Sequence, residues 1–358
     1  MTLKFQQRVD EIRDDVKQYT EGELRVPPSD SIIYTPLYID ILKEQRKDKP
    51  RIGLFGPSTV YGTTVKKGEN TTAGVLQAEQ PAYKVANLGL TGARFTETYA
   101  ILSDVIDSID YVVYEINYGI AVISDQESEV TVYPQLVAKL GHPGFDEWTA
   151  AFPEKQNEQA RSQFQQDVEQ HVLNEWPLYR DRDLLSFDHL KTRTTKERLR
   201  RIYQKWADGQ GSESGMQPEL TTAYVAMTKE QQAAVNDHFK ELYAWKRPFD
   251  PKHSFGLYAM EQTLKLLKQH GKKVLFYTAP LDRELIDREQ LLDWQEYSTV
   301  MAAYRQLIES YNYALVDFNQ DGLTISHQYY HDPSHLLDEG SKQFGQILAR
   351  KIRQQLLP

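Results

Sequence analysis

The chain of 358 residues carries a formal net charge of −9 at pH 7 and contains no cysteine. Its 40% hydrophobic and 26% charged residues are typical of a globular protein rather than of a disordered chain. The negative charge argues against a general nucleic-acid binder, which needs a basic surface to displace counterions. The absence of cysteine excludes disulfides, cysteine-ligated zinc, thiol nucleophiles and iron–sulfur clusters.

Residues 1–50 predict an N-terminal helical segment. Apolar side chains recur near helical spacing from Leu3 to Val16, with charged residues between them, until Pro27-Pro28 interrupts the pattern. A second apolar stretch runs from residue 32 to residue 42 and ends in a charged turn. We therefore treat this segment as helical and as separate from the chain beyond residue 50.

Five short apolar runs beyond this segment predict buried β-strands. They are residues 51–55, 83–88, 111–114, 273–278 and 313–318. Helical patterns lie between or after several of them, at residues 72–80, 95–108, 293–311 and 338–357. Short apolar strands that alternate with helices are typical of a parallel sheet covered on both faces. The predicted fold class is therefore α/β, a three-layer α/β/α, flavodoxin-like, doubly wound parallel sheet.

The alternation is interrupted between the third and fourth predicted strands. Residues 122–270 are rich in Gln, Glu, Tyr and Trp and show helical stretches without buried strands. We interpret them as a mainly helical insertion or cap on an α/β domain formed by residues 51–121 and 271–358. Basic residues cluster between residues 191 and 205. One interpretation is a surface that binds an anionic polymer or lipid headgroups, and the other is a solvated helix face.

Small or polar residues follow the predicted strands at their carboxyl ends, where open parallel sheets collect functional groups. Gly-Pro-Ser occupies residues 56–58, Asn-Leu-Gly-Leu-Thr-Gly residues 87–92, and Glu-Ile-Asn-Tyr residues 115–118. A fourth block, His-Asp-Pro-Ser-His at residues 331–335, follows the last predicted strand. These four blocks are the candidate functional residues.

In their order and strand context the four blocks resemble the SGNH or GDSL hydrolase superfamily. That family places a nucleophilic Ser after its first strand, a Gly after its second, an Asn after its third and an Asp-x-x-His pair before its last helix. The matching positions are Ser58, Gly89, Asn117, Asp332 and His335. The resemblance implies a serine-dependent esterase or O-acyltransferase that works through an acyl-enzyme and needs no metal or organic cofactor.

The flanking residues depart from the usual family pattern. Residues 56–58 read Gly-Pro-Ser where the family has Gly-Asp-Ser, and residues 115–118 read Glu-Ile-Asn-Tyr where it has Gly-x-Asn-Asp. In this the chain looks more like divergent cell-envelope members, such as the D-alanyl-transfer protein DltD and the alginate O-acetyltransferases. That likeness implies an acyl ester on a surface glycan or related envelope polymer as substrate, and a membrane-bound acyl-transfer partner.

The catalytic residues also suit this chemistry on physical grounds. A serine hydroxyl is a weak nucleophile and needs a positioned base. His335 can take the proton of Ser58, and Asp332 can hold the imidazole in the tautomer that this transfer requires. The three residues are therefore the predicted catalytic triad.

An acyl-transfer intermediate also needs donors for its oxyanion. We predict that the backbone N–H groups of Ser58 and Gly89 and the side-chain amide of Asn117 supply them. Tyr61 and Tyr118 adjoin these blocks in the sequence, and we expect both to line the pocket.

Other interpretations of the same blocks stay open. Residues 56–58 also suit an ordinary turn, residues 87–92 a dinucleotide loop, and Asn117 a loop cap. His331, Asp332 and His335 suit a metal site if the two histidines share one helical face. The alternative function is that of a catalytically impaired SGNH-fold protein that serves binding or as a scaffold in the cell envelope.

No stretch reaches the roughly 20 apolar residues that cross a bilayer, and the N-terminus lacks the apolar core of a signal peptide. From the envelope resemblance we expect an extracytoplasmic location, at the cell surface or in the periplasm, with the anchor or signal absent from this sequence. A cytoplasmic location is the alternative. The sequence indicates neither the acyl group, the acceptor nor the oligomeric state.

Overall fold

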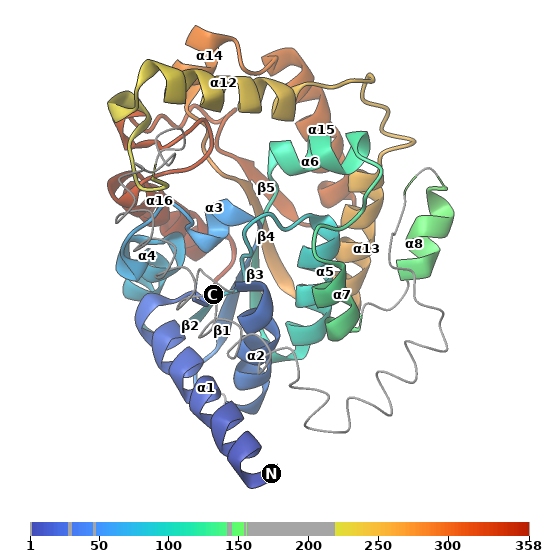
Figure 1. Cartoon of the computed structure of the whole chain (residues 1–358). Helices are drawn as coiled ribbons and strands as arrows, with labels where there is room; N and C mark the ends of the chain where they lie inside the picture. The colour runs from blue at the N-terminus through green and yellow to red at the C-terminus, as the bar shows by residue number, and fades with distance from the viewer. Residues whose placement is uncertain are drawn as a thin grey trace, which may run out of the picture.

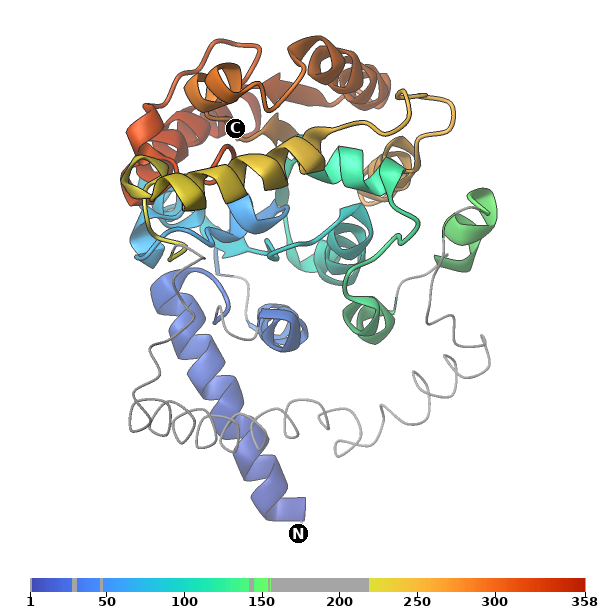
Figure 2. The same cartoon turned by 45° about the horizontal axis from the view of Figure 1, so that its top comes forward.

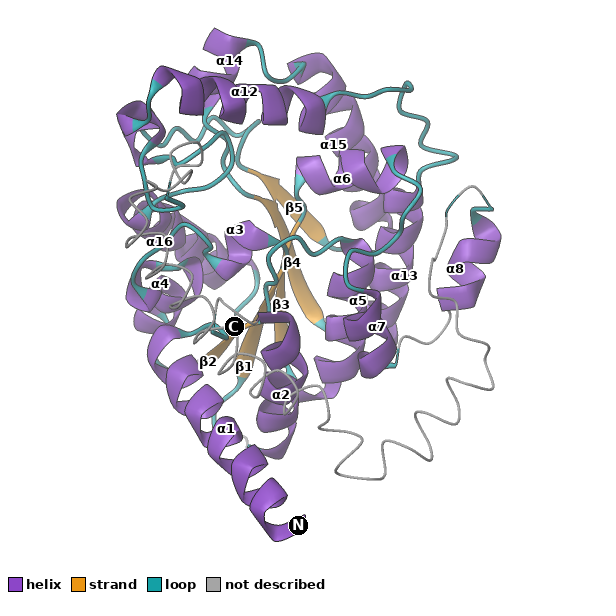
Figure 3. Ribbon diagram, in the orientation of Figure 1, coloured by secondary structure: helices purple, strands orange, loops and turns teal. Residues whose placement is uncertain are grey.

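The computed structural model describes residues 2–27, 31–45, 48–141, 145–153, 155 and 219–357. Within these ranges the chain forms a five-stranded sheet with helices on both faces (Figures 1 and 3). The strands are β1 (Arg51–Phe55), β2 (Lys84–Asn87), β3 (Tyr111–Glu115), β4 (Lys273–Thr278) and β5 (Ala314–Asp317). Their order is β2-β1-β3-β4-β5, and all neighbouring pairs are parallel. The predicted α/β fold class is confirmed.

Two groups of helices cover the sheet and complete the three layers (Figure 1). One face carries α4 (Thr72–Glu79) and α16 (Asp338–Gln355). The other carries α2 (Ser31–Glu44), α5 (Phe95–Val105), α13 (Phe255–Gln269) and α15 (Trp294–Ser310). None of the described helices is long and apolar enough to cross a membrane.

Shorter elements and the N-terminal helix surround this framework. The α-helices are α1 (Thr2–Glu23), α3 (Ser58–Tyr61), α6 (Tyr118–Gln126), α7 (Pro134–Leu140), α8 (Phe145–Ala151), α12 (Lys229–Tyr243) and α14 (Arg283–Glu289). The 3-10 turns are η2 (Gly68–Asn70), η3 (Ile106–Ser108), η5 (Tyr224–Ala226) and η6 (His327–Tyr329). All five strands match the predicted runs to within one residue at each end, whereas the sequence analysis missed α3 and α14.

Alternation along the strands accounts for a core on each face of the sheet. Ile52 and Leu54 of β1 are fully buried in a cluster with side chains of α4 and α16. Phe55 and Tyr114 are buried on the opposite face, in a cluster with side chains of α5 and α13. Successive strand side chains point to opposite faces, so strands buried on both faces need an unbroken apolar run. This is the pattern that made the strands predictable.

The N-terminal helices form a small core of their own and are fastened to the main domain. Val9 of α1 and Ile41 of α2 belong to a separate apolar cluster. Arg25, just beyond α1, donates from Nη1 to the Gly62 carbonyl at 2.6 Å and from Nη2 to the Lys66 carbonyl at 3.2 Å. The N-terminal segment therefore supports the loop that follows α3.

The described part of segment 122–270 contributes in two places. Helix α13 packs in the same core as α5 and α15 and leads directly into β4, so it serves as a crossover helix of the sheet. Helix α12 lies across the end of the molecule where the strands terminate, on the same side as α3 (Figures 1 and 2). The division into core and insertion stays a prediction, since the basic cluster between residues 191 and 205 and its surroundings lie outside the described residues.

Candidate active site

A sharp turn after β1 brings Ser58 to the carboxyl edge of the sheet. Gly56, the first residue of this turn, has a φ of +154°. A Cβ at this position would lie 2.6 Å from Val60 Cγ2 and 2.9 Å from Glu115 Cβ, so glycine alone fits without a shift of its neighbours. Ser58 is the first residue of α3 and is partly exposed. The turn therefore presents the serine hydroxyl at the end of the strand.

A second turn, between η6 and α16, presents Asp332 and His335. The His331 N–H donates to the His335 carbonyl at 2.9 Å, which closes the turn. Oδ1 of Asp332 accepts the N–H groups of Ser334 at 2.8 Å and of His335 at 2.9 Å. An aspartate that accepts backbone N–H groups in this way stabilises its own turn. The spacing of the two side chains is thus set by local hydrogen bonds.

The structure brings Ser58, His335 and Asp332 together. Ser58 Oγ lies 2.7 Å from His335 Nε2. His335 Nδ1 lies 2.9 Å from Oδ1 and 2.8 Å from Oδ2 of Asp332. Because Nδ1–H donates to the carboxylate, Nε2 is left as the acceptor for the serine hydroxyl. This is the geometry that a serine nucleophile, its base and an orienting acid require.

Nearby carboxylates favour the protonated form of His335. Burial alone favours the neutral ring, but Asp332 at Nδ1 and the more distant Glu115 outweigh it and raise the pKa of His335. Burial also disfavours the ionised form of Asp332, yet the charge of His335 and the hydrogen bonds to the carboxylate lower the pKa of Asp332. An ionised Asp332 therefore stabilises the imidazolium that forms when His335 accepts a proton.

Ser58 and Asn117 supply two donors at the same edge of the sheet. Ser58 stands at the start of a helix, and within the described residues no hydrogen bond occupies its N–H. Asn117 caps α6 by accepting the Ile120 N–H at Oδ1, 3.3 Å away. Its Nδ2 donates to Glu115 Oε1 at 3.4 Å, which leaves the second N–H of the amide available. The cap and the predicted donor use different atoms, so the two interpretations of Asn117 are compatible.

Gly89 does not serve as predicted, and the structure gives the physical reason. Its N–H donates to Asn87 Oδ1 at 3.1 Å and is therefore not free for an oxyanion. A Cβ at Gly89 would lie 2.6 Å from the backbone nitrogen of Tyr61. The glycine thus permits a close approach of α3 rather than of a substrate.

Gly92 in the same loop offers an N–H that the sequence analysis missed. Leu90 to Ala93 form a β-turn closed by Ala93 N–H donating to the Leu90 carbonyl at 3.0 Å, and Gly92 has the φ of +76° that a type II turn needs. Across the ranges that the structure describes, no hydrogen bond occupies the Gly92 N–H. Thr91 Oγ1 lies 2.8 Å from Thr63 Oγ1, so the turn sits beside the loop that follows α3.

The two tyrosines expected to line the pocket are instead packed into the protein. Tyr61 is 2% exposed and donates from its hydroxyl to the Val26 carbonyl at 2.6 Å. Tyr118 is 4% exposed, accepts a hydrogen bond from Trp245 Nε1 at 2.9 Å, and packs against the Tyr297 ring. Neither lines the cavity beside Ser58. This expectation was therefore wrong, because both rings are buried among partners away from this cavity.

Glu115 is a site residue whose role the sequence analysis did not assign. It lies at the end of β3, is 2% exposed, and lines the cavity beside Ser58 and His335. Thr59 Oγ1 donates to its Oε1, and Tyr277 donates to its Oε2 at 3.3 Å. Burial raises the pKa of Glu115, against the effect of these donors. The signal that was available is a carboxylate directly after an apolar run.

Residues from segment 122–270 also hold the turn that carries His335. The Tyr224 N–H donates to the Tyr330 carbonyl at 2.9 Å, and His331 Nδ1 lies 2.7 Å from the Thr222 carbonyl. His331 and His335 lie on this turn and share no helical face, and both ring nitrogens of His335 are engaged. No group of three or more metal-binding side chains occurs in the part of the chain that the structure describes.

Comparisons with known proteins give a likeness of fold only. No protein-family model matches the chain, and no curated protein matches it. Similar solved structures include a carbohydrate acetylesterase family member from Sinorhizobium meliloti, at 11% identity and a TM-score of 0.38 over 86% of this chain and 99% of that chain. A lipase/acylhydrolase from Enterococcus faecalis matches at 11% identity and 0.39, over 86% and 97%. An acetyl xylan esterase, AlAXEase, matches at 14% and 0.37, over 84% and 99%. These similarities are too low to define an activity, so we base the function on the side chains of the site.

Proposed function

We propose that the chain is a serine-dependent ester hydrolase that works through an acyl-enzyme. The observation that carries the proposal is the unbroken line of hydrogen bonds from Asp332 through His335 to Ser58. Folding alone does not require that a buried carboxylate, an imidazole and a partly exposed hydroxyl be linked in this way at the end of a strand. Together they form a nucleophile with its base.

The first half-reaction forms the acyl-enzyme. Ser58 Oγ attacks the ester carbonyl carbon while its proton passes to His335 Nε2, and Asp332 stabilises the imidazolium. The carbonyl oxygen becomes an oxyanion that accepts hydrogen bonds from the Ser58 N–H, the Asn117 amide and the Gly92 N–H. The intermediate collapses as the bond to the alcohol oxygen breaks, and His335 returns the proton to this leaving oxygen.

The second half-reaction releases the acyl group. Water attacks the acyl carbon and gives a proton to His335 Nε2. The bond between the acyl carbon and Ser58 Oγ then breaks, His335 returns the proton to Oγ, and the carboxylic acid is released. A sugar hydroxyl in place of water would make the same chain an O-acyltransferase. As substrate we propose an acylated surface glycan or related envelope polymer at an extracytoplasmic site, supported by the likeness of residues 56–58 and 115–118 to envelope members of the superfamily.

A fluorophosphonate probe tests the nucleophile directly. We expect it to modify Ser58 in the wild type, as located by mass spectrometry of the labelled peptide, and to spare Ser58→Ala. Turnover of p-nitrophenyl acetate should fall at least about 1000-fold in Ser58→Ala. Ser298→Ala is the matched control, since Ser298 is exposed and its Oγ donates to the Trp294 carbonyl on the solvent side of α15. A folded Ser58→Ala with wild-type turnover would exclude the mechanism, and a folded wild type without label or turnover would favour a binding or scaffold protein.

A further inference from the structure

Tyr133 contacts the turn that carries Gly92. Its hydroxyl donates to the Thr91 carbonyl at 2.7 Å. A Cβ on Gly92 would lie 2.9 Å from the same hydroxyl oxygen, so the two residues are in close contact. Tyr133 itself is half-buried, just ahead of α7. A side chain from a distant part of the sequence therefore holds the central peptide of this turn.

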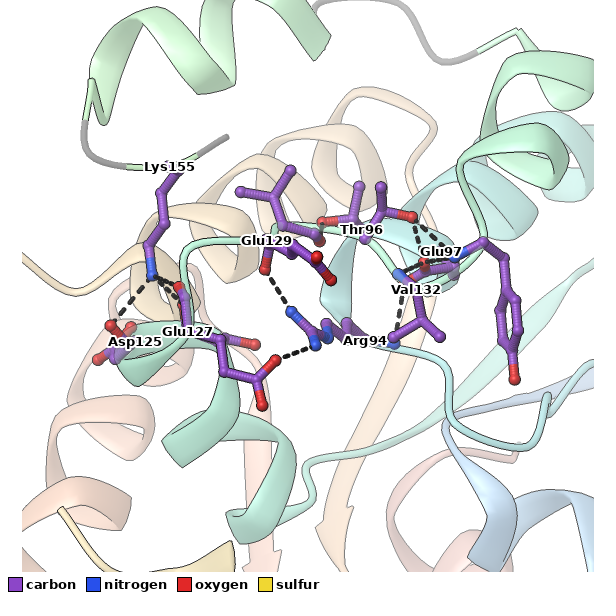
Figure 4. Close-up of polar contacts among 12 residues, drawn as sticks. Arg94, Thr96, Glu97, Asp125, Glu127, Glu129, Val132 and Lys155 are labelled. Atoms are coloured by element: carbon purple, nitrogen blue, oxygen red, sulfur yellow. Dashed lines mark hydrogen bonds and ion pairs between the residues drawn. The ribbon is translucent and has the colours of Figure 1, made fainter. Parts of the chain in front are cut away.

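The backbone of Tyr133 is fixed by a buried carboxylate. Glu97, in the first turn of α5, is fully buried, and its Oε1 accepts the N–H groups of Val132 at 2.6 Å and Tyr133 at 2.9 Å (Figure 4). Thr131 Oγ1 donates to the same oxygen, and the Arg94 N–H donates to Oε2 at 2.9 Å. Tyr133 thus bridges the start of α5 and the turn at Gly92.

Further contacts anchor the segment that leads to Tyr133. The Arg94 guanidinium donates to the Glu129 carbonyl and to the Glu127 carboxylate, and Lys155 Nζ donates to the carbonyls of Ser124 and Asp125 (Figure 4). The segment from α6 to α7 is therefore anchored at several points. Because its segment is anchored in this way, Tyr133 can resist movement of the turn at Gly92.

The hydroxyl contact decides the direction of the Gly92 N–H. In a planar trans peptide the C=O and the following N–H point in opposite directions, so a donor on the Thr91 carbonyl turns the Gly92 N–H away from Tyr133. Types I and II of a β-turn differ mainly in the orientation of this central peptide. Without the hydroxyl the peptide is freer to rotate, and the N–H then leaves its position.

We propose that Tyr133 is a positioning residue for the oxyanion site, which holds the Thr91–Gly92 peptide so that the Gly92 N–H meets the developing charge. The inference rests on the proposed function, since it deepens the account of the same site. Thr91 is also held from the other side, where its Oγ1 contacts Thr63, and Thr63 Oγ1 donates to the Ser58 carbonyl at 3.4 Å. The turn is therefore clamped between Tyr133 and the segment that bears the nucleophile.

Tyr133→Phe removes the hydroxyl and keeps the ring. If the variant loses the equivalent of one neutral hydrogen bond in the transition state, kcat for p-nitrophenyl acetate should fall about 3- to 10-fold, with KM unchanged. The matched control is Tyr313→Phe, because Tyr313 also donates to a backbone carbonyl, that of Lys272 at 3.2 Å, at the opposite edge of the sheet. We expect Tyr313→Phe to keep wild-type kcat and KM.

A thionoester separates positioning of the oxyanion donors from a general loss of structure. Sulfur is larger than oxygen and a weaker acceptor, so the thiono analogue of p-nitrophenyl acetate gains less from these donors. Tyr133→Phe should therefore lower the ratio of ester to thionoester turnover, and Tyr313→Phe should not. Glu97→Gln is the second variant: it keeps the hydroxyl, disturbs the Arg94 contact, and should lower the same ratio.

The outcomes separate the two proposals. An active wild type with a Tyr133→Phe variant of unchanged kcat, or of lowered kcat with an unchanged ratio, overturns the role of Tyr133 alone. If Tyr133→Phe does not fold, a Glu97→Gln variant that keeps the wild-type ratio overturns that role instead. A folded wild type that turns over neither ester and takes no fluorophosphonate label overturns both proposals.

Discussion

Replacing Asp332 by Asn tests the orienting acid without removing its backbone contacts. Oδ1 of Asp332 accepts two backbone N–H groups, from Ser334 and His335, whereas both oxygens receive His335 Nδ1. In Asp332→Asn the two backbone donors require the carbonyl oxygen at the Oδ1 position. The amide NH2 then lies at the Oδ2 position, 2.8 Å from His335 Nδ1.

This arrangement favours the wrong tautomer of His335. An NH2 group donates, so at the closer Oδ2 position it favours an Nδ1 that accepts, with the ring proton on Nε2. Nε2–H cannot take the Ser58 proton, and the serine loses its base. A triad held in the wrong tautomer loses about 1000- to 10,000-fold in kcat, and we expect a fall of this size at neutral pH.

Asp332→Ala provides the contrast. It leaves the tautomer of His335 free but removes the acceptor of two backbone N–H groups, which costs about 1–3 kcal/mol of unfolding free energy per buried group. Asp332→Asn should therefore be more stable than Asp332→Ala in urea unfolding, yet no more active. The order of stability and the order of activity separate folding from tautomer control.

The pH profile gives a second readout of the same variant. Asp332 raises the pKa of His335, and the base works only when neutral, so wild-type kcat/KM should rise with pH through a value above that of an ordinary histidine. Without the carboxylate charge, the acid limb of the residual activity should move to lower pH. Retention of more than a tenth of wild-type kcat by folded Asp332→Asn, or an acid limb that does not move, would refute the reasoning.

Two further substitutions separate catalysis from packing. Asn117→Ala should lower kcat about 100- to 1000-fold with little change in KM, as for loss of an oxyanion donor, and should cost about 1 kcal/mol in chemical unfolding because α6 loses its cap; wild-type kcat in the folded variant would exclude Asn117 as a donor. Gly89→Ala should instead act through packing, since its Cβ meets Tyr61 N at 2.6 Å, and should lower the unfolding free energy by about 1–3 kcal/mol. A Gly89→Ala variant of wild-type stability that lost kcat as Asn117→Ala does would show that its N–H is a donor after all.

The parts of the fold that were predictable are those that local composition determines. The strands are buried on both faces, and this demands unbroken apolar runs that are visible in the sequence. The structure brings Ser58, Asp332 and His335 within hydrogen-bond reach of one another. They could be predicted as candidates because each stands at a predicted strand end or before the last predicted helix. The role of α13 as a crossover helix was not predicted. Its amphipathic pattern lies in a segment without strands, and its packing partners are distant in sequence.

The donors of the site were less predictable, because hydrogen bonding and not residue type selects among them. Residues 87–92 contain two glycines, and nothing local distinguishes them. The side chain of Asn87 occupies the N–H of Gly89, while Tyr133 binds the carbonyl next to Gly92 from more than 40 residues away. These contacts, and not the residue type, separate the two glycines.

The residues at which the chain departs from the pattern that it resembles are linked to each other in space. A Cβ at Gly56 would meet Glu115 Cβ at 2.9 Å, so the turn before Ser58 and the residue at the end of β3 constrain one another. Thr59 and Asn117 both donate to Glu115 Oε1, which joins the helix of the nucleophile to the proposed oxyanion donor. In a site that had merely decayed, Glu115 would be a buried carboxylate without partners, and such a group is costly. The partners of Glu115 instead come from the candidate site itself, and this favours the proposed hydrolase over the scaffold alternative.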